Sequence, residues 1–553
     1  MATVTSSYDY VVCGSGSAGG VVAARLSEDD NISVLLLEAG PSDLDWPSTH
    51  IPAKAASLQR TDIDWNYKCE PQVNGYKALE ACFWPRGKVL GGCSSNNFMC
   101  FTRCSSVDYD SWAQAGCTGW SWKELLPYFL KTENCKCPKL VGSKFHNTGG
   151  PLTIKHRGNQ LSDAFIDAGV ELGFKQVDVN SGDIIGFGDF PMTIDEDGKR
   201  TSVARTYIHP AMERSNLTVL CNAVVTKVNI EDKKVVGVSF RTKEGDKFVK
   251  VNKEAIVSGG AVNSPQILML SGIGPKEHLR EIGIDCIADL PVGKNLQDHL
   301  NMIVKVSVKE GTEIHTDEYC ATGTNPKEGV AFFKTGLEEL KTEAPDIQIV
   351  HLLGEIPSGP VTSAHVYKDP KFFPLENYDN TSEERMRKIG FSLFICLLHP
   401  KSIGEVKLRS NDPLDPPIIN PNYLDDPYDV KALIEGIRFA KRVTETKAMA
   451  SFECKFHCMK IPDGTHDEWS GEHLEQVIRH YARTVYHPTS TCKMAATEDK
   501  TAVVDPQLRV LGIQGLRVVD ASIMPNVPSG NTNAPAIMIG EKGADLIKIG
   551  RQE

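Results

Sequence analysis

The apolar positions at the amino terminus follow the pattern of a strand, a helix and a second strand. Residues 10–13 and 32–37 are short apolar runs, and the first is bounded by glycine, as buried parallel strands commonly are. Residues 18–26, between the two runs, have a helical pattern. The sequence therefore predicts a strand–helix–strand unit that begins a parallel sheet.

The same patterns predict further elements in the first half of the chain. We expect a helix pair over residues 112–132, a helix over 161–173, a glycine-rich loop over 182–197, antiparallel strands over 217–230 and 235–251, and a short apolar strand over 255–257. A helix is then expected to start around Ser264 and Pro265, because proline suits the first turn of a helix.

From residue 300 to about 471 the pattern changes to alternating strands separated by long polar loops. The expected strands are residues 302–308, 347–353, 389–398 and 405–408. Aromatic residues recur here, and their spacing favours packing in a core over a substrate site; they are Phe332, Phe333, Phe372, Phe373, Phe391 and Phe394. This region is therefore predicted to form a largely antiparallel sheet whose loops cover a pocket.

The last segment predicts a strand ending at Asp520, a glycine loop and a helix from about Ala534, so the tail is expected to rejoin the first domain. The fold class is thus α/β: a Rossmann-like nucleotide-binding domain, discontinuous in sequence, plus an α+β substrate domain. The expected division is 1–160, 206–299 and 476–553 for the nucleotide domain, and 161–205 and 300–475 for the substrate domain.

Composition narrows the class of protein further. A chain of 553 residues is too long for one compact core, and its net charge of −11 argues against a nucleic-acid partner. No apolar run is long enough to span a membrane, and the first residues lack a secretory pattern, so a cytoplasmic location is expected. The 16 cysteines form neither a disulfide framework nor a metal motif, which predicts free thiols and no metal site.

Three glycines follow the first apolar run in the pattern G-x-G-x-x-G. Gly14 permits a tight turn, Gly16 lets the backbone approach a pyrophosphate, and Gly19 lets the helix pack closely on the strand. Glu38 ends the second apolar run, where its carboxylate can accept hydrogen bonds from an adenosine ribose. The motif predicts a dinucleotide site but leaves NAD and FAD both open.

A second glycine-rich stretch lies at residues 83–103. Arg86, Lys88 and the glycines that follow make a basic, flexible loop. Ser94, Ser95, Asn96 and Asn97 come next, and they can hydrogen-bond a polar ring edge or a diphosphate. The same residues also suit the caps of an ordinary helix start, so both interpretations stay open at this point.

Four separated motifs together resemble the glucose–methanol–choline (GMC) oxidoreductases, FAD enzymes that mostly oxidise alcohols. They are the glycine-rich stretch from Gly87 to Asn97, residues 260–274 ending in SPQILMLSGIG, the string HPTSTCKM at 487–494, and DASIMP followed by GNTNAP. The first motif departs from the family in having Cys93 where serine or threonine is commoner. The resemblance covers nearly the whole chain and implies FAD as the cofactor.

The resemblance also implies a set of FAD-binding residues. The glycine loop and Glu38 would hold the ADP half of FAD. Ser17 and Ala18 would lie at the pyrophosphate, and Asp520 would approach the diphosphate. The backbone of Val225 would contact the adenine. The residues expected along the isoalloxazine and the loops beside it are Val89, Gly92, Cys93, Asn96, Asn97, Phe98, Met99 and Cys100, with Asn533 as a further cofactor contact. Some relatives attach FAD through a histidine where this chain has Asn96, so a non-covalent flavin is expected.

Alcohol oxidation needs a group that takes the hydroxyl proton, and histidine suits this task. The resemblance assigns that role to His487 and a supporting role to Asn531, with Asn533 as the nearby competitor. His299 and His399 also lie in recognisable motifs, and we interpret both as structural.

The predicted activity is oxidation of a small-molecule alcohol to a carbonyl, with O₂ or a quinone-type compound as the electron acceptor. Two other branches of the family are alternatives. The hydroxynitrile lyase branch keeps both FAD and the histidine without net redox chemistry. The light-driven fatty-acid decarboxylase branch has a small residue in place of the histidine, which argues against it here.

Overall fold

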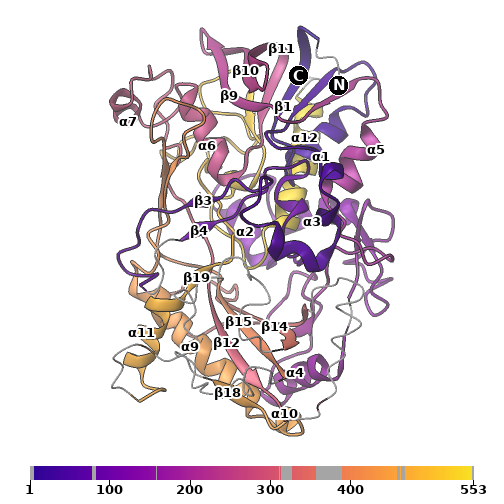
Figure 1. Ribbon diagram of the computed structural model, residues 1–553, viewed down its shortest axis with the longest axis vertical. Helices are drawn as coiled ribbons and strands as arrows, with labels where there is room; N and C mark the ends of the chain where they lie inside the picture. The colour runs from indigo at the N-terminus through magenta and orange to yellow at the C-terminus, as the bar shows by residue number, and fades with distance from the viewer. Residues whose placement is uncertain are drawn as a thin grey trace.

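The computed structural model describes residues 5–77, 82–156, 158–309, 312, 327–355, 389–457, 461 and 467–550. Within these ranges the chain builds two seven-stranded sheets, one in each half of the elongated molecule (Figure 1). Strand β1 (Ser7–Cys13) and the C-terminal helix α12 (Asn533–Ile549) lie together at the same end. The first and last parts of the sequence therefore share one domain, as predicted.

The first sheet is mostly parallel and has the order β8-β2-β1-β11-β10-β9, with β20 paired to β11. Its other strands are β2 (Val34–Leu37), β8 (Leu217–Leu220), β9 (Val224–Glu231), β10 (Lys234–Thr242), β11 (Gly245–Val257) and β20 (Leu516–Val518). Helix α1 (Gly19–Leu26) connects β1 to β2, and all four residues of β2 are buried. This is the strand–helix–strand unit of a Rossmann-like sheet.

Helix α12 packs against α1, which itself packs on β1 and β2. Gly540 allows the approach, because a Cβ atom there would lie 2.7 Å from the carbonyl oxygen of Ala18. The buried carboxylate of Glu541 accepts hydrogen bonds from Arg25 of α1 at 2.8 Å and from the Tyr207 hydroxyl at 2.9 Å. The C-terminal segment is thereby fixed beside the glycine loop of the amino terminus.

The second sheet is antiparallel throughout and has the order β18-β12-β15-β14-β13-β7, with β19 paired to β12. The strands are β7 (Gly186–Asp189), β12 (Leu300–Ser307), β13 (Lys327–Phe333), β14 (Ile347–Glu355), β15 (Ile389–Leu397), β18 (Lys455–His457) and β19 (Arg483–Thr484). Helix α9 (Pro427–Thr444) packs on one face, where Gly436 lets it approach Ile395 of β15. The other face is left to line a cavity.

The remaining elements support these two sheets. The helices are α2 (Ser106–Gln114), α3 (Trp122–Thr132), α4 (Gln160–Glu171), α5 (His209–Ala211), α6 (Gly260–Leu270), α7 (Lys276–Glu281), α10 (Lys447–Ala450) and α11 (Gly471–Tyr481). The short strand pairs are β3 (Tyr67–Lys68) with β4 (Phe83–Trp84), β5 (Glu133–Cys135) with β6 (Leu152–Ile154), and β16 (Glu405–Lys407) with β17 (Ile418–Asn420).

Several predicted boundaries are wrong. Helix α2 begins at Ser106, six positions before the predicted start, because Ser105 and Asp108 form a capping box. Helix α6 begins at Gly260 rather than near Ser264 and Pro265. Proline inside a helix leaves the carbonyl four residues earlier without its donor. Here the Thr491 hydroxyl donates to that carbonyl, of Ala261, at 2.7 Å, so the helix tolerates the proline.

Two strand assignments also need correction. The predicted loop at 182–197 contains β7, which pairs with β13 at the edge of the second sheet. Residues 217–230 are two strands separated by a break at Asn222, which has a φ of +56°. The first of them, β8, pairs in parallel with β2 and is not antiparallel. Phe372 and Phe373 lie outside the described residues.

The predicted fold class is confirmed: a parallel Rossmann-like sheet joins a separate antiparallel sheet. None of the helices within the described ranges has the length and apolar character needed to cross a membrane.

Candidate active site and dinucleotide cleft

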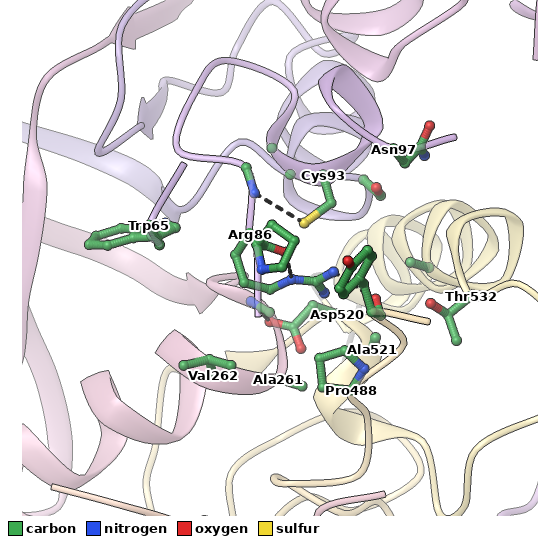
Figure 2. Close-up of a pocket in the computed structure, with 18 of the residues that line it drawn as sticks. Trp65, Arg86, Cys93, Asn97, Ala261, Val262, Pro488, Asp520, Ala521 and Thr532 are labelled. Carbon is green, nitrogen blue, oxygen red and sulfur yellow. Dashed lines mark hydrogen bonds between the residues drawn. The ribbon is translucent and has the colours of Figure 1, made fainter. Parts of the chain in front are cut away.

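A continuous cavity lies between the two sheets and is lined by both of them and by the C-terminal segment. It extends from the glycine loop and Glu38 at one end to His487 and the exposed face of the antiparallel sheet at the other. Figure 2 shows its middle, where Arg86 and Cys93 come from one wall and Pro488 and Ala521 from another. The Arg86 guanidinium donates to the Tyr486 carbonyl at 2.6 Å, which ties these walls together.

The glycine loop has little room for side chains except where a ligand would approach. Gly14 has a φ of +108°, and a Cβ atom there would lie 2.4 Å from the Ser258 carbonyl oxygen. A Cβ atom at Gly19 would lie 2.0 Å from the Gly14 carbonyl oxygen, whereas one at Gly16 would meet no atom within 4 Å. Gly16 therefore faces open cavity at the amino end of α1, where an anionic phosphate is favoured.

Glu38 is buried at the same end of the cavity. Its carboxylate accepts hydrogen bonds from the Ser15 hydroxyl at 2.5 Å, from the Ser15 amide at 3.1 Å and from the Gly40 amide at 2.9 Å. Burial raises the pKa of this carboxyl, although these donors act in the opposite direction. Val225 of β9 lines the cavity nearby.

The C-terminal segment closes the middle of the cavity. Asp520 accepts hydrogen bonds from the Gly260 amide at 2.8 Å and the Ser264 hydroxyl at 2.5 Å, so it anchors the start of α6. Asn533, at the start of α12, accepts a hydrogen bond from the Ser17 hydroxyl at 2.8 Å. Asn533 therefore lies beside the glycine loop and not beside His487.

The predicted isoalloxazine loop contributes most of its members to the cavity. Those that line it are Gly92, Cys93, Asn96, Asn97, Phe98, Met99 and Cys100. Val89 does not; it is buried against Leu58 and Ile63. Ala18 and Gly19 likewise lie behind the lining, in the first turn of α1.

His487 and Asn531 meet at the substrate end of the cavity. The Asn531 amide nitrogen lies 3.2 Å from His487 Nε2, and Asn531 Oδ1 is buried without a hydrogen-bond partner among the described residues. The backbone amide of His487 donates to Asp298 at 2.8 Å, and Asp298 also accepts from the hydroxyls of Thr484 and Tyr423. Burial raises the pKa of the Asp298 carboxyl to about 6. The backbone of the predicted catalytic residue is thus held in place by a buried acid.

His299 contacts the other ring nitrogen of His487. The two Nδ1 atoms are 3.0 Å apart, and His299 Nε2 lies 3.0 Å from the Leu398 carbonyl oxygen. Burial lowers the pKa of His299 to about 3, so its ring is neutral at physiological pH. The Leu398 carbonyl only accepts hydrogen bonds, so it favours the tautomer of His299 that carries the proton on Nε2 and accepts through Nδ1; a second backbone carbonyl, that of Pro528, also bonds this ring.

This contact determines the tautomer of His487. Because His299 Nδ1 accepts, His487 Nδ1 donates the proton between them, and His487 Nε2 keeps its lone pair. That lone pair accepts a hydrogen bond from the Asn531 amide at the cavity, in the position where the hydroxyl of a ligand could replace it. The arrangement is that of a base ready to take a proton from a bound ligand.

The interpretation of His299 as purely structural was incomplete, since its ring touches His487. No local signal in the sequence identifies the contact, which joins residues 188 positions apart. His399, by contrast, bonds the Ser529 hydroxyl at 2.9 Å and does not line the cavity.

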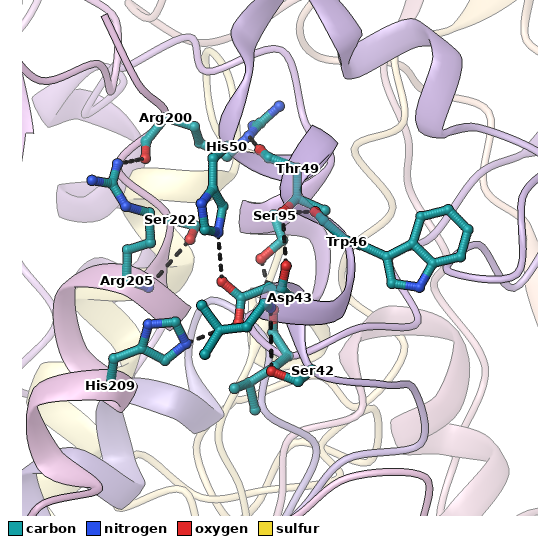
Figure 3. Close-up of polar contacts among 12 residues, drawn as sticks. Ser42, Asp43, Trp46, Thr49, His50, Ser95, Arg200, Ser202, Arg205 and His209 are labelled. Carbon is teal, nitrogen blue, oxygen red and sulfur yellow. Dashed lines mark hydrogen bonds and ion pairs between the residues drawn. The ribbon is translucent and has the colours of Figure 1, made fainter. Parts of the chain in front are cut away.

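Asp43 holds the loop that follows β2 against the rest of the nucleotide domain (Figure 3). Its buried carboxylate lies 2.9 Å from Nε2 of His50 and 2.9 Å from Nε2 of His209. Burial alone would raise the pKa of Asp43, but the hydrogen bonds from the two imidazoles outweigh it and lower the pKa. The loop is therefore fixed to α5 by a charged carboxylate.

We expect Asp43→Asn to lower the free energy of unfolding by about 2–3 kcal/mol at neutral pH, because hydrogen bonds to a charged group are lost. A carboxyl whose pKa is lowered in the folded state stabilises above its unfolded pKa and loses this effect as pH falls. The difference between the two proteins should thus shrink below about pH 4. Thermal unfolding of both proteins over this pH range measures the difference in stability. The control is Asp45→Asn, on the exposed side of the same loop. An equal loss in both variants would contradict this role.

A second buried polar cluster lies outside the cavity. Glu133, Cys135 and His146 bring their ligand-type atoms within 4.8 Å of one another. His146, however, bonds Glu133 at 2.6 Å and Asp178 at 3.0 Å through its two nitrogens, and Arg103 pairs with Glu133. The cluster is a buried ion network that joins β5 to the loops around it.

A Rossmann-like sheet, a glycine loop open toward a long cavity and an acceptor histidine at its far end define a two-domain oxidoreductase that binds a dinucleotide. Comparison of the sequence with models of known protein families identifies the family. The GMC oxidoreductase family models match residues 8–301 with the N-terminal part and 400–540 with the C-terminal part. The chain belongs to the GMC oxidoreductases, which are FAD-dependent enzymes.

Relatives extend over almost the whole chain. Glucose dehydrogenase (FAD, quinone) of Drosophila pseudoobscura pseudoobscura is 40% identical over 98% of this chain and 87% of its own length. Alcohol dehydrogenase (acceptor) of Pseudomonas putida is 39% identical over 98% and 95%. Mitochondrial choline dehydrogenase of Mus musculus is 38% identical over 98% and 89%.

Solved structures share the fold over its full extent. Pyridoxine 4-oxidase from Mesorbium loti superposes with a TM-score of 0.83 at 29% identity, covering 98% of this chain and 99% of that one. A variant of Aspergillus oryzae RIB40 formate oxidase superposes with a TM-score of 0.85 at 25% identity, and the match covers 100% of both chains.

Proposed function

We propose that this protein oxidises a small-molecule alcohol to the corresponding carbonyl compound. The observation that carries the proposal is the hydrogen-bonded chain from the Leu398 carbonyl through His299 to His487, which leaves the His487 Nε2 lone pair at the cavity. It is supported by relatives named as dehydrogenases of alcohol, glucose and choline, all of which are CH–OH compounds.

The residues of the cavity suit FAD. Gly14, Gly16, Ser17 and Glu38 would hold the ADP half, with Val225 at the adenine and Asp520 and Asn533 at the diphosphate. The loop from Gly92 to Cys100 would lie along the isoalloxazine, and Ala18, Gly19 and Val89 would act from behind by shaping the loops. When bound, FAD accepts the hydride from the carbinol carbon of the substrate.

The protein's own residues deal with the hydroxyl group. His487 Nε2 accepts its proton as the O–H bond breaks, and the electron pair released forms the carbonyl double bond while the hydride leaves from carbon. Asn531 directs its side-chain amide to the same oxygen. His299 keeps the proton of His487 on Nδ1, so that Nε2 remains the acceptor.

We expect the flavin to be non-covalent, because Asn96 lines the cavity at the position of covalent attachment in some relatives and an amide cannot form that bond. Denaturing the purified protein in acid and removing the precipitate should leave the yellow colour in solution. Flavin retained in the precipitate would contradict the assignment.

The activity is tested by mixing the protein with alcohols in the absence of oxygen and following the flavin absorption band. Oxidation predicts bleaching of the band together with one carbonyl product per flavin. A hydroxynitrile lyase would leave the flavin oxidised while it cleaved its substrate. Re-oxidation of the bleached protein by O₂ or by a quinone would then identify the acceptor.

A further inference from the structure

The antiparallel sheet presents two cross-strand rows of side chains to the substrate end of the cavity. Asn301 of β12, Cys396 of β15 and Gln348 of β14 are directly opposite one another, and so form the first row. The second row, one step further along the strands, is Ile303, Phe394 and Val350. Side chains two positions apart on a strand share a face, so both rows point into the same space.

The first row, which we call the amide row, is polar, buried and incompletely hydrogen-bonded. Asn301 is 4% exposed and Gln348 is 2% exposed. Asn301 Oδ1 and Gln348 Nε2 have no hydrogen-bond partner among the described residues. An unpaired buried amide atom is costly, and native structures rarely keep two of them in one row of a sheet without a reason. A ligand in the cavity would supply the missing partners.

The amide row begins beside the reactive histidine. His299, which contacts His487, precedes Asn301 by two positions, and Asn301 pairs across the sheet with Arg483 of β19. The short thiol of Cys396 lies between the two amides, and burial raises its pKa, so it is uncharged. Neighbouring strands are about 4.8 Å apart, which places the Asn301 and Gln348 backbones about 10 Å apart with a recess between them. One ligand oxygen in that recess can reach both amides.

The pair of unpaired atoms identifies the chemistry of that oxygen. One amide offers an acceptor and the other a donor, and a hydroxyl is the group that both donates and accepts. Exchanging the oxygen and nitrogen of both amides reverses which side donates and keeps a hydroxyl as the partner that fits both.

The charged side chains that line this end of the cavity disfavour a cationic ligand. Among the described residues that line the cavity, the only carboxylates are Glu38 and Asp520, and both are engaged at the dinucleotide end. Arg483, which pairs with Asn301 across the sheet, and Arg86, which bonds the Tyr486 carbonyl, also line the cavity. The buried carboxylate of Asp298 at this end does not line the cavity and already accepts hydrogen bonds from His487, Thr484 and Tyr423. A quaternary ammonium group in the cavity would therefore lie near cations without a carboxylate to contact, although choline dehydrogenase is among the relatives.

We propose that the amide row binds a second, uncharged hydroxyl group of the substrate, so that the protein acts on a neutral diol or polyol; this rests on the proposed alcohol oxidation. The reacting hydroxyl lies at His487 and the second one lies between Asn301 and Gln348. The apolar row of Ile303, Phe394 and Val350 then covers the carbon chain.

The test compares straight-chain diols of increasing length with monoalcohols of the same carbon number, as substrates for anaerobic flavin reduction. For at least one chain length, the diol should have the larger second-order rate constant by about tenfold or more, because the monoalcohol leaves the amides unpaired. Choline should be slower than its uncharged tert-butyl analogue. Equal rates within every pair, or a preference for choline, would overturn the proposal.

The double variant N301L/Q348M should lose the diol preference, and M302L, a change that conserves volume in the core on the opposite face of β12, should keep it. The melting temperature of the double variant should not fall, since two unpaired polar groups are replaced by apolar ones. A double variant that keeps the preference, or that melts well below the wild type, would assign the amides a structural role instead. If no alcohol bleaches the flavin while dithionite does, the proposed alcohol oxidation is wrong. If alcohols bleach the flavin without a preference for diols, only the role of the amide row is wrong.

Discussion

The His487→Ala variant is expected to bind flavin normally and to reduce it with alcohol about 10²–10⁴-fold more slowly than the wild type, the usual contribution of a general base. The reason is the lone pair on His487 Nε2, beside Asn531 at the cavity, which we propose as the proton acceptor. Without it, the hydroxyl proton must leave to water while the hydride departs. Anaerobic stopped-flow reduction of the flavin by a saturating alcohol measures the loss.

The matched control is His480→Ala. His480 lies on α11, and its ring bonds the Gln476 carbonyl at 2.7 Å without lining the cavity. This variant should reduce its flavin at the wild-type rate. If His487→Ala instead stayed within about threefold of the wild type, His487 would be removed from the proton transfer.

The second large effect is expected at His299. Replacing it by phenylalanine fills the same buried space but removes the acceptor for the proton on His487 Nδ1. His487 can then carry its proton on Nε2, and that nitrogen can no longer accept the proton of the substrate hydroxyl. Loss of such a supporting partner typically costs about 10–100-fold in activity, and we expect the loss in kcat rather than in KM.

The His299→Gln variant separates positioning from packing. A glutamine side chain can accept from His487 through its oxygen and donate to the Leu398 carbonyl through its nitrogen. It should recover most of the rate that His299→Phe loses. Equal losses in both variants, with unchanged flavin content, would argue that the imidazole fills space and does not set the tautomer.

The parts of the fold that depend on local sequence could be predicted. The strand–helix–strand unit at the amino terminus follows from consecutive residues, because apolar runs, glycines and helix-forming residues occur in order. The C-terminal return to the first sheet was also predicted, and α12 begins one residue before the expected Ala534. In the site, His487 and Asn531 are in contact, and the roles that the resemblance gives them stay a prediction.

The features that the sequence did not reveal depend on contacts between distant segments. The Thr491 hydroxyl that satisfies the carbonyl freed by Pro265 is 230 positions away from that carbonyl. The amide row exists only because of the strand register that places Asn301 and Gln348 on either side of Cys396. Neither residue stands out by type or by motif, and register cannot be read from one strand alone. The role of His299 was missed for the same reason.

The aromatic residues of the second domain show which part of their placement the sequence spacing predicts. Phe332, Phe333 and Phe391 are buried in the core, as their spacing predicted. Phe394, three positions from Phe391, lines the cavity on the opposite face of β15. The alternation of the strand, rather than the residue type, decides which aromatic ring faces a substrate.

The central claim is that a neutral His487 takes the proton of an alcohol, and the pH dependence of anaerobic flavin reduction tests it most directly. Since burial lowers the pKa of His299 to about 3, that ring stays uncharged in the assay, whereas burial raises the pKa of Asp298 to about 6. The part of the acid limb that disappears in His487→Ala therefore reports the loss of the His487 lone pair, and a part that remains belongs to Asp298. The account predicts that the wild-type rate rises from acid to neutral pH and levels off, and that His487→Ala is slow and lacks the His487 part of this limb. The same acid limb in His487→Ala, at rates near those of the wild type, would contradict it.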